Sequence, residues 1–247
     1  MQIKNTQPIA AWWVIGFALV LPTLITWIYF IALDGSSAWL QQGAYSTLKT
    51  LQFALPLAYV FALRRRLHRT NHVIAPLQNP FSLRGIPLGI AFGLMIAVTG
   101  WLLYAGWLKP AGYFDSAAGI AREKIKGMGL NSLAAYGALA IFYSLVHSLL
   151  EEYYWRWFVF GQLQQVTRPP AAIAISSLGF MAHHVLVLAK FFGWTSPAMY
   201  LLAAAVAIGG IACAWLYRQS KSLAGPWISH AMIDALIFYV GYDLLHS

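Results

Sequence analysis

The chain is built from long apolar runs separated by short polar segments. Each run is long enough to cross a membrane as a helix, since about 20 mostly apolar residues span the hydrocarbon core of a bilayer. The runs are residues 10–33, 46–63, 86–108, 132–160, 170–192, 197–217 and 225–245. The pattern predicts an all-α, polytopic transmembrane helix bundle with about seven spans, in a range of roughly six to eight.

One segment between these runs is too highly charged to be read as a span. Residues 110–130 contain Arg122, Glu123, Lys124 and Lys126. Charges at this density disfavour a transmembrane position, whereas an amphipathic helix can lie in the plane of the membrane surface. We therefore expect a surface helix here and not an eighth span.

The composition favours a single integral membrane domain over residues 1–247. Hydrophobic residues make up 60% of the chain and charged residues only 9%, against about 25% charged residues in soluble domains. The net charge of +9 comes mostly from Lys and Arg beside apolar runs, where such charges orient helices. Because no basic stripe with interleaved aromatic residues is present, the charge does not indicate a nucleic-acid partner. The partner that the composition requires is the lipid bilayer.

The distribution of positive charge predicts an orientation. The densest cluster, Arg64 to Arg69 with Arg84, lies between the second and third predicted spans. Cytoplasmic loops carry an excess of Lys and Arg, so this loop is expected in the cytoplasm, with the N-terminus on the same side. The low charge and short loops favour a bacterial cytoplasmic membrane.

Ionisable residues at membrane depth are costly and are therefore candidates for function. The first group lies late in the fourth predicted span and contains Glu151, Glu152 and Arg156. Glu152 and Arg156 are four residues apart and can form an ion pair on one helix face. Glu151 points about 100° away and has no such partner, although His147 lies one turn before it. A helix end at the lipid headgroups, where all three charges are solvated, would explain the same pattern.

The second and third groups are His184, in the middle of the fifth predicted span, and His230 with Asp234, early in the seventh. A single histidine on an apolar helix is more often a packing residue, and His183 points elsewhere and can serve as interhelical contact. Asp234, four residues after His230, can orient its imidazole, or the two can hold helices together. The predicted topology places all three groups in the cytoplasmic half of the membrane, so they can converge.

The three groups resemble, in order and spacing, the signatures of the CPBP family (CAAX protease and bacteriocin-processing, or Abi) of intramembrane proteases. The resemblance covers residues 132–240, the predicted catalytic core. The matching motifs are Glu151-Glu152-x-x-x-Arg156, Phe180-x-x-x-His184 and His230-x-x-x-Asp234.

What the resemblance implies is hydrolysis of a peptide bond in a membrane-associated protein or peptide. Glu151 and His184 correspond to the family residues that activate a water, and His230 and Asp234 to those near the oxyanion. The motif ends in Asp or Asn across the family, whereas the eukaryotic CAAX prenyl endopeptidases have Asn.

The resemblance also raises the question of a metal, because the family is often described as metalloproteases. Glu151, His184 and His230 could supply the two-histidine, one-carboxylate set of a catalytic zinc site. The sequence has no His-Glu-x-x-His motif, and a water activated by Glu and His needs no metal. Zinc and a metal-independent reaction both stay open at this point.

Two functions of other classes are compatible with the sequence. A non-catalytic bacteriocin self-immunity or membrane scaffold protein of the same family would keep the motifs without hydrolysis. A proton-coupled transporter could also use buried Glu and His residues, but no inverted repeat or pair of broken helices is present. The sequence indicates neither a cleavage site nor an oligomeric state.

Overall fold

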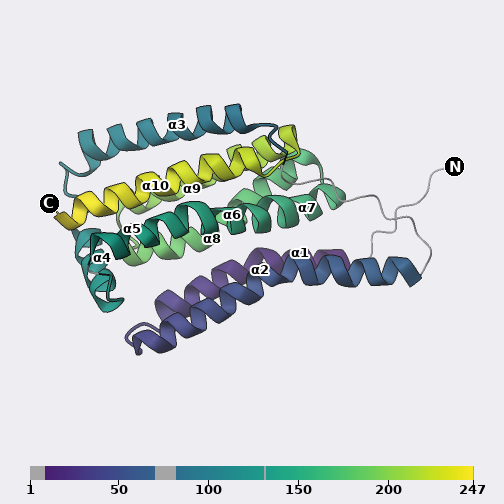
Figure 1. The fold of residues 1–247 in the computed structure, drawn as a ribbon, viewed down its shortest axis with the longest axis horizontal. Helices are drawn as coiled ribbons and strands as arrows, with labels where there is room; N and C mark the ends of the chain where they lie inside the picture. Colours follow the sequence, from purple (N-terminus) through teal and green to yellow (C-terminus); the bar gives the residue numbers. More distant parts are fainter. Residues whose placement is uncertain (1–8, 70–81, 131, 247) are drawn as a thin grey trace.

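The computed structural model describes residues 9–69, 82–130 and 132–246, and almost all of these residues are helical. Several helices contain π-helical stretches, labelled η, that continue an α-helix without a break. The helices are α1 (Ile9–Trp27) with η1 (Ile28–Ala32), α2 (Ala38–Arg69), α3 (Ile86–Leu103) with η2 (Tyr104–Leu108), α4 (Asp115–Gly127), α5 (Leu133–Ile141) with η3 (Phe142–His147), α6 (Ser148–Glu152), η4 (Tyr153–Phe160) and α7 (Gly161–Val166), then α8 (Pro169–Phe192), α9 (Pro197–Ser220) and α10 (Ala224–His246). Figure 1 shows these helices as an elongated bundle.

Six helices are long and apolar enough to cross a membrane, within the part of the chain that the structure describes. They confirm the predicted fold class, a polytopic bundle of six to eight spans. The six are Trp12–Ala32, Ile86–Leu108, Leu133–Val166, Pro169–Phe192, Pro197–Ser220 and Ala224–His246.

The predicted span 46–63 lies inside α2, which is helical over 32 residues but is not one of the six. The described part of α2 carries polar residues such as Lys49 and Gln52 among its apolar ones. The charged segment 110–130 contains α4, whose 13 residues are too few for a span.

Glycines let α3 and α10 pack closely. Gly85, Gly89 and Gly93 recur every four residues and so lie along one side of the chain where α3 begins. A Cβ on Gly89 would overlap the backbone of Gly225 in α10, and one on Gly93 would lie 2.8 Å from the sulfur of Met232. Small residues at this spacing are typical of membrane helix contacts. The contact fixes the position of α10, which carries His230.

The buried core surrounds η4. Tyr154 and Trp155 are fully buried and pack with residues of α1, α8 and α9. The Tyr154 hydroxyl donates a hydrogen bond to the carbonyl of Ala18 in α1, at 2.7 Å. π-helical segments occur preferentially at functional sites, and here η3 and η4 enclose the short helix α6. The core therefore anchors the helix that carries the two glutamates.

Helix α2 runs beside the helix formed by η3, α6 and η4. The ring of Phe53 lies 6.3 Å from that of Tyr154, and the ring of Tyr59 lies 5.6 Å from that of Phe158. Residue numbers rise together along both helices, so the two run parallel. This arrangement places the middle of α2 beside Glu151.

Candidate active site

Glu151 and Glu152 end α6 and are both buried, with 3% and 0% of their surface exposed. Arg156, in η4, is 2% exposed. Consecutive helical residues point about 100° apart, so the two carboxylates face different neighbours. Their burial contradicts the alternative of charges solvated at a helix end.

The carboxylate of Glu152 is held from two sides. Arg156 Nε lies 3.1 Å from Glu152 Oε2, which confirms the predicted ion pair. His230 Nδ1 lies 2.8 Å from Glu152 Oε1. Because an ionised carboxylate only accepts hydrogen bonds, His230 donates from Nδ1. Glu152 therefore joins α6 to α10 and fixes the ring orientation of His230.

The carboxylate of Glu151 faces four cationic or imidazole groups from different helices. Oε1 lies 3.5 Å from His183 Nε2, 3.8 Å from Lys49 Nζ and 3.9 Å from His147 Nε2, and Oε2 lies 3.9 Å from His230 Nε2. The predicted proximity of His147 is confirmed. The convergence of the three predicted groups is also observed, since histidines of α8 and α10 lie beside this carboxylate, which belongs to α6.

The view that Glu151 has no ion-pair partner is wrong, because Lys49 of α2 pairs with it. Lys49 is 8% exposed and lies in the interior. Its ammonium also lies 5.7 Å and 5.4 Å from the ring centroids of Tyr45 and Phe53. Buried lysines need such compensation. No pattern within α2 alone indicated a carboxylate just over a hundred residues later in the chain.

Both histidines of α8 lie at the site, so the view that His183 points elsewhere is also wrong. His183 is the closer to Glu151 and stacks on Trp155, with ring centroids 5.7 Å apart and planes 3° from parallel. His184 Nδ1 lies 2.9 Å from the carbonyl of Phe180. A carbonyl only accepts, so His184 donates from Nδ1, and its Nε2 is left to accept a proton or bind a ligand.

Asp234 lies close to His230 but does not hold it as tightly as Glu152 does. The distance from Asp234 Oδ1 to His230 Nε2 is 3.6 Å, against 2.8 Å for the Glu152 contact. Asp234 is therefore beside the imidazole, as its spacing predicted, while the shorter bond from a different helix orients the ring.

The residues that fit a metal ion best are Glu151, His183 and His184. One ligand atom of each lies within 4.8 Å of the others. Two imidazoles and one carboxylate are the donors of many catalytic zinc sites, so the chemistry of the set fits zinc. The predicted set had His230 in place of His183. In the structure, His230 lies on the other carboxylate oxygen, Oε2.

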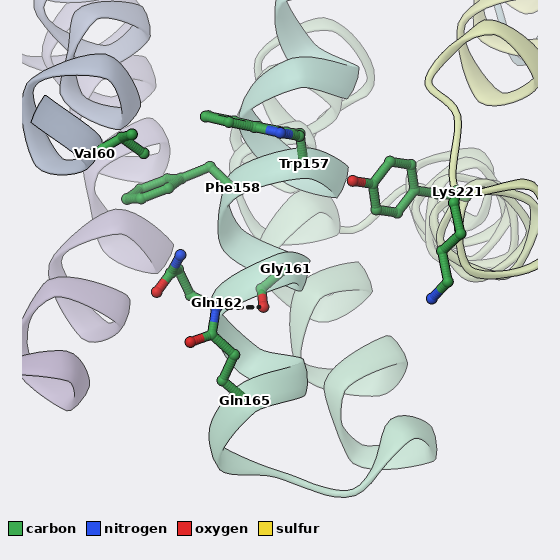
Figure 2. Close-up of a pocket in the computed structure, with 8 residues that line it drawn as sticks. Val60, Trp157, Phe158, Gly161, Gln162, Gln165 and Lys221 are labelled. Carbon is green, nitrogen blue, oxygen red and sulfur yellow. Dashed lines mark hydrogen bonds between the residues drawn. The ribbon is translucent and has the colours of Figure 1, made fainter. Parts of the chain in front are cut away.

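A separate pocket lies farther along the helix that carries Glu151, beside η4 and α7. Figure 2 shows Trp157, Phe158 and Gln162 on one wall, with Val60 of α2 and Lys221, at the end of α9, on the others. None of the ionisable residues around Glu151 lines it. The pocket is therefore distinct from the site described above.

Comparison with known proteins identifies the part of the chain that carries these groups. Residues 134–236 match the family model described as Type II CAAX prenyl endopeptidase Rce1-like. The match agrees with the predicted resemblance of this segment to the CPBP family of CAAX proteases. No curated protein and no solved structure matches the chain. The matched segment contains every predicted site residue from Glu151 to Asp234, whereas Lys49 lies outside it.

A second residue of α2 was also missed from the sequence. Gln52 is 0% exposed, and neither Oε1 nor Nε2 of its amide has a hydrogen-bond partner among the described residues. Buried amides almost always have partners. The only signal in the sequence was the presence of Lys49 and Gln52 in an otherwise apolar run, and it did not indicate which way they face.

Proposed function

We propose that the protein is an intramembrane endopeptidase that hydrolyses a peptide bond of a membrane-associated protein or peptide with a water activated by Glu151. The observation that carries this proposal is the buried carboxylate of Glu151 with His183 and His230 3.5–3.9 Å from its oxygens. Distances of that size are longer than ideal direct hydrogen bonds, so the carboxylate and the imidazoles converge on one point and can share a water as a common hydrogen-bond partner.

In the proposed reaction, Glu151 accepts a proton from a water that His184 Nε2 or His183 Nε2 helps to position. The water oxygen bonds to the carbonyl carbon of the substrate, and the carbonyl oxygen becomes an oxyanion. Breaking the C–N bond then expels the amine, which takes the proton from Glu151. A carboxylate with this role acts first as a general base and then as a general acid.

His230 is proposed to stabilise the oxyanion. Its Nδ1 is held by Glu152 at 2.8 Å, so the ring orientation is fixed before substrate binds. With both ring nitrogens protonated, Nε2 donates a hydrogen bond to the developing negative charge. An ionised Asp234 would repel that charge, so Asp234, 3.6 Å from His230 Nε2, is proposed to be protonated, while Glu152 orients the ring.

A zinc ion, if bound, would be held by Glu151, His183 and His184 and would polarise the attacking water and the carbonyl. The residues themselves can position and deprotonate a water, so the proposed steps do not depend on the ion. Cleavage measured with and without a chelator, and again after zinc is restored, decides between the two versions.

The test of the proposal compares cleavage of a fluorogenic peptide library by purified wild type and by Glu151→Gln. The Gln variant keeps the size of the side chain but cannot accept the proton. We expect loss of cleavage by a factor of about 100 to 10,000. The melting temperature should fall because the buried Lys49 loses its charged partner, but the variant should remain folded at the temperature of the assay. Glu123→Gln is the matched control, because Glu123 is exposed on α4. Full cleavage by Glu151→Gln would overturn the assignment of the base.

The same variant distinguishes the proposed enzyme from a non-catalytic immunity or scaffold protein. An enzyme loses its cellular phenotype both on deletion of the protein and in Glu151→Gln. A scaffold loses the phenotype on deletion alone, since Glu151→Gln leaves its surface unchanged.

We also propose that the protein lies in a bacterial cytoplasmic membrane with the active site towards the cytoplasm. The support is the positive charge next to the start of α3. Leu83, before α3, and Met128, after α4, are exposed, and the native Cys213 is buried. A membrane-impermeant thiol reagent applied to whole cells should label Met128→Cys and leave Leu83→Cys unlabelled. The reverse pattern would contradict the proposed orientation.

A further inference from the structure

Helix α2 presents a polar face to the candidate active site although it lies outside the matched segment 134–236. Lys49 reaches the carboxylate of Glu151. The ring of Phe53 lies 6.2 Å from that of His147 and 6.3 Å from that of Tyr154. Gln52 points about 60° from Lys49 on the same helix, so it belongs to this face and lies about one turn from Lys49.

The buried amide of Gln52 is costly as it stands. Its exposure is 0% and neither amide atom has a partner among the described residues. Leaving a buried amide without hydrogen bonds destabilises the folded protein, because the amide has lost its water partners and gained none. Leucine has a similar size without this cost, so a purely structural role would not explain a glutamine here.

A glutamine amide has one acceptor and one donor group, the complement of a peptide bond in an extended chain. A peptide lying along α2 towards Glu151 would offer both partners. We propose that Gln52 binds the backbone of the substrate peptide and holds it beside Glu151. This inference rests on the proposed endopeptidase function and adds a substrate-positioning residue from outside the matched segment.

The chain provides a matched control on the same helix. Gln42 is half-buried, and its Nε2 donates a hydrogen bond to the Tyr29 hydroxyl at 2.9 Å. Gln42→Leu removes a bond that exists in the folded protein, whereas Gln52→Leu removes an amide that has none. We therefore expect Gln42→Leu to lower the stability of the folded protein without affecting cleavage, and Gln52→Leu to weaken cleavage without lowering stability.

The experiment uses the full-length protein in detergent and a fluorogenic peptide that the wild type cleaves and Glu151→Gln does not. Gln52→Leu should lower kcat/KM about threefold to tenfold, the loss of one or two hydrogen bonds, mainly through a higher KM, with an equal or higher melting temperature. Gln42→Leu should lower the melting temperature and leave kcat/KM unchanged. Gln52→Met replaces the Leu variant if that variant does not fold.

The peptide itself supplies the second half of the test. Each backbone amide is replaced in turn by an ester, which removes the N–H donor. At one position the ester should weaken cleavage by the wild type but not further weaken cleavage by Gln52→Leu. Unchanged kinetics in Gln52→Leu would overturn the proposal and assign the amide to an internal water. A parallel fall in melting temperature and activity would overturn it in favour of a structural role.

A failure of the proposed function gives a different result. In that case no peptide is cleaved in a manner that depends on Glu151, and the substrate-positioning role of Gln52 is overturned together with the proposed function. Cleavage that depends on Glu151 but not on Gln52 overturns the substrate-positioning role alone.

Discussion

Replacing Arg156 by Met should destabilise the protein strongly, because it leaves a buried carboxylate without its main cation. Glu152 and Arg156 are 0% and 2% exposed, and their closest atoms are 3.1 Å apart. Removing one partner of a buried ion pair costs about 3–5 kcal/mol. The remaining hydrogen bond from His230 Nδ1 to Glu152 should hold the cost near the lower end, about 3 kcal/mol.

The second variant in this test removes both charges. Arg156→Met combined with Glu152→Leu leaves no buried charge unpaired, and apolar replacements of buried pairs are often neutral or stabilising. Most of the lost stability should therefore return. Cleavage activity should not return, because His230 then lacks the carboxylate that orients its ring.

Thermal unfolding in detergent, followed by tryptophan fluorescence, measures both effects. A loss of about 3 kcal/mol corresponds to a fall in melting temperature of roughly 6–12 °C for a chain of this size. An exposed ion pair would contribute only about 0–1 kcal/mol. An exposed pair of that strength would shift the melting temperature by about 2 °C. A melting temperature of Arg156→Met within about 2 °C of wild type would therefore refute the buried-pair reasoning. A double variant no more stable than the single variant would refute it as well.

Two further predictions concern parts of the fold away from Glu151 and Glu152. Gly89→Ala should lower the melting temperature, since its new Cβ would overlap Gly225 and separate α3 from α10. Gly16→Ala should leave the melting temperature unchanged, because its Cβ meets nothing within 4 Å. Equal melting temperatures of the two variants would contradict the close contact between α3 and α10. The hydrogen bond from Lys190 at 2.6 Å keeps the pKa of Asp34 below its ordinary value, so this pair stabilises the protein at neutral pH and the contribution is lost as pH falls through the lowered pKa. Asp34 is half exposed, so Lys190→Met should lower the free energy of unfolding by at most about 1 kcal/mol at pH 7. At a pH where Asp34 is protonated, the substitution should not change this free energy. An equal loss at both pH values in unfolding experiments would refute the prediction.

Much of the fold, and the ion pair between Glu152 and Arg156, could be predicted from the sequence, because both depend on the local pattern of residues along the chain. Apolar runs of sufficient length must be helices in lipid, where backbone groups can only be satisfied internally. The contact between Glu152 and Arg156 follows from four-residue spacing on one helix. The closeness of His147 to Glu151 follows from the same rule, and so does that of Asp234 to His230.

Only the tertiary structure decided which side chains meet across helices. Lys49 pairs with Glu151, His230 binds Glu152, and His183 lies closer to Glu151 than its neighbour does. Each of these contacts depends on how far one helix is rotated and shifted against another. Helix rotation is set by packing, such as the glycine contacts of α3 on α10 and the aromatic core around η4, and the π-helical segments beside α6 change the angular spacing of the residues that follow. Periodicity within one helix contains no information about these rotations, so the set of residues around Glu151 became visible only when the helices were assembled.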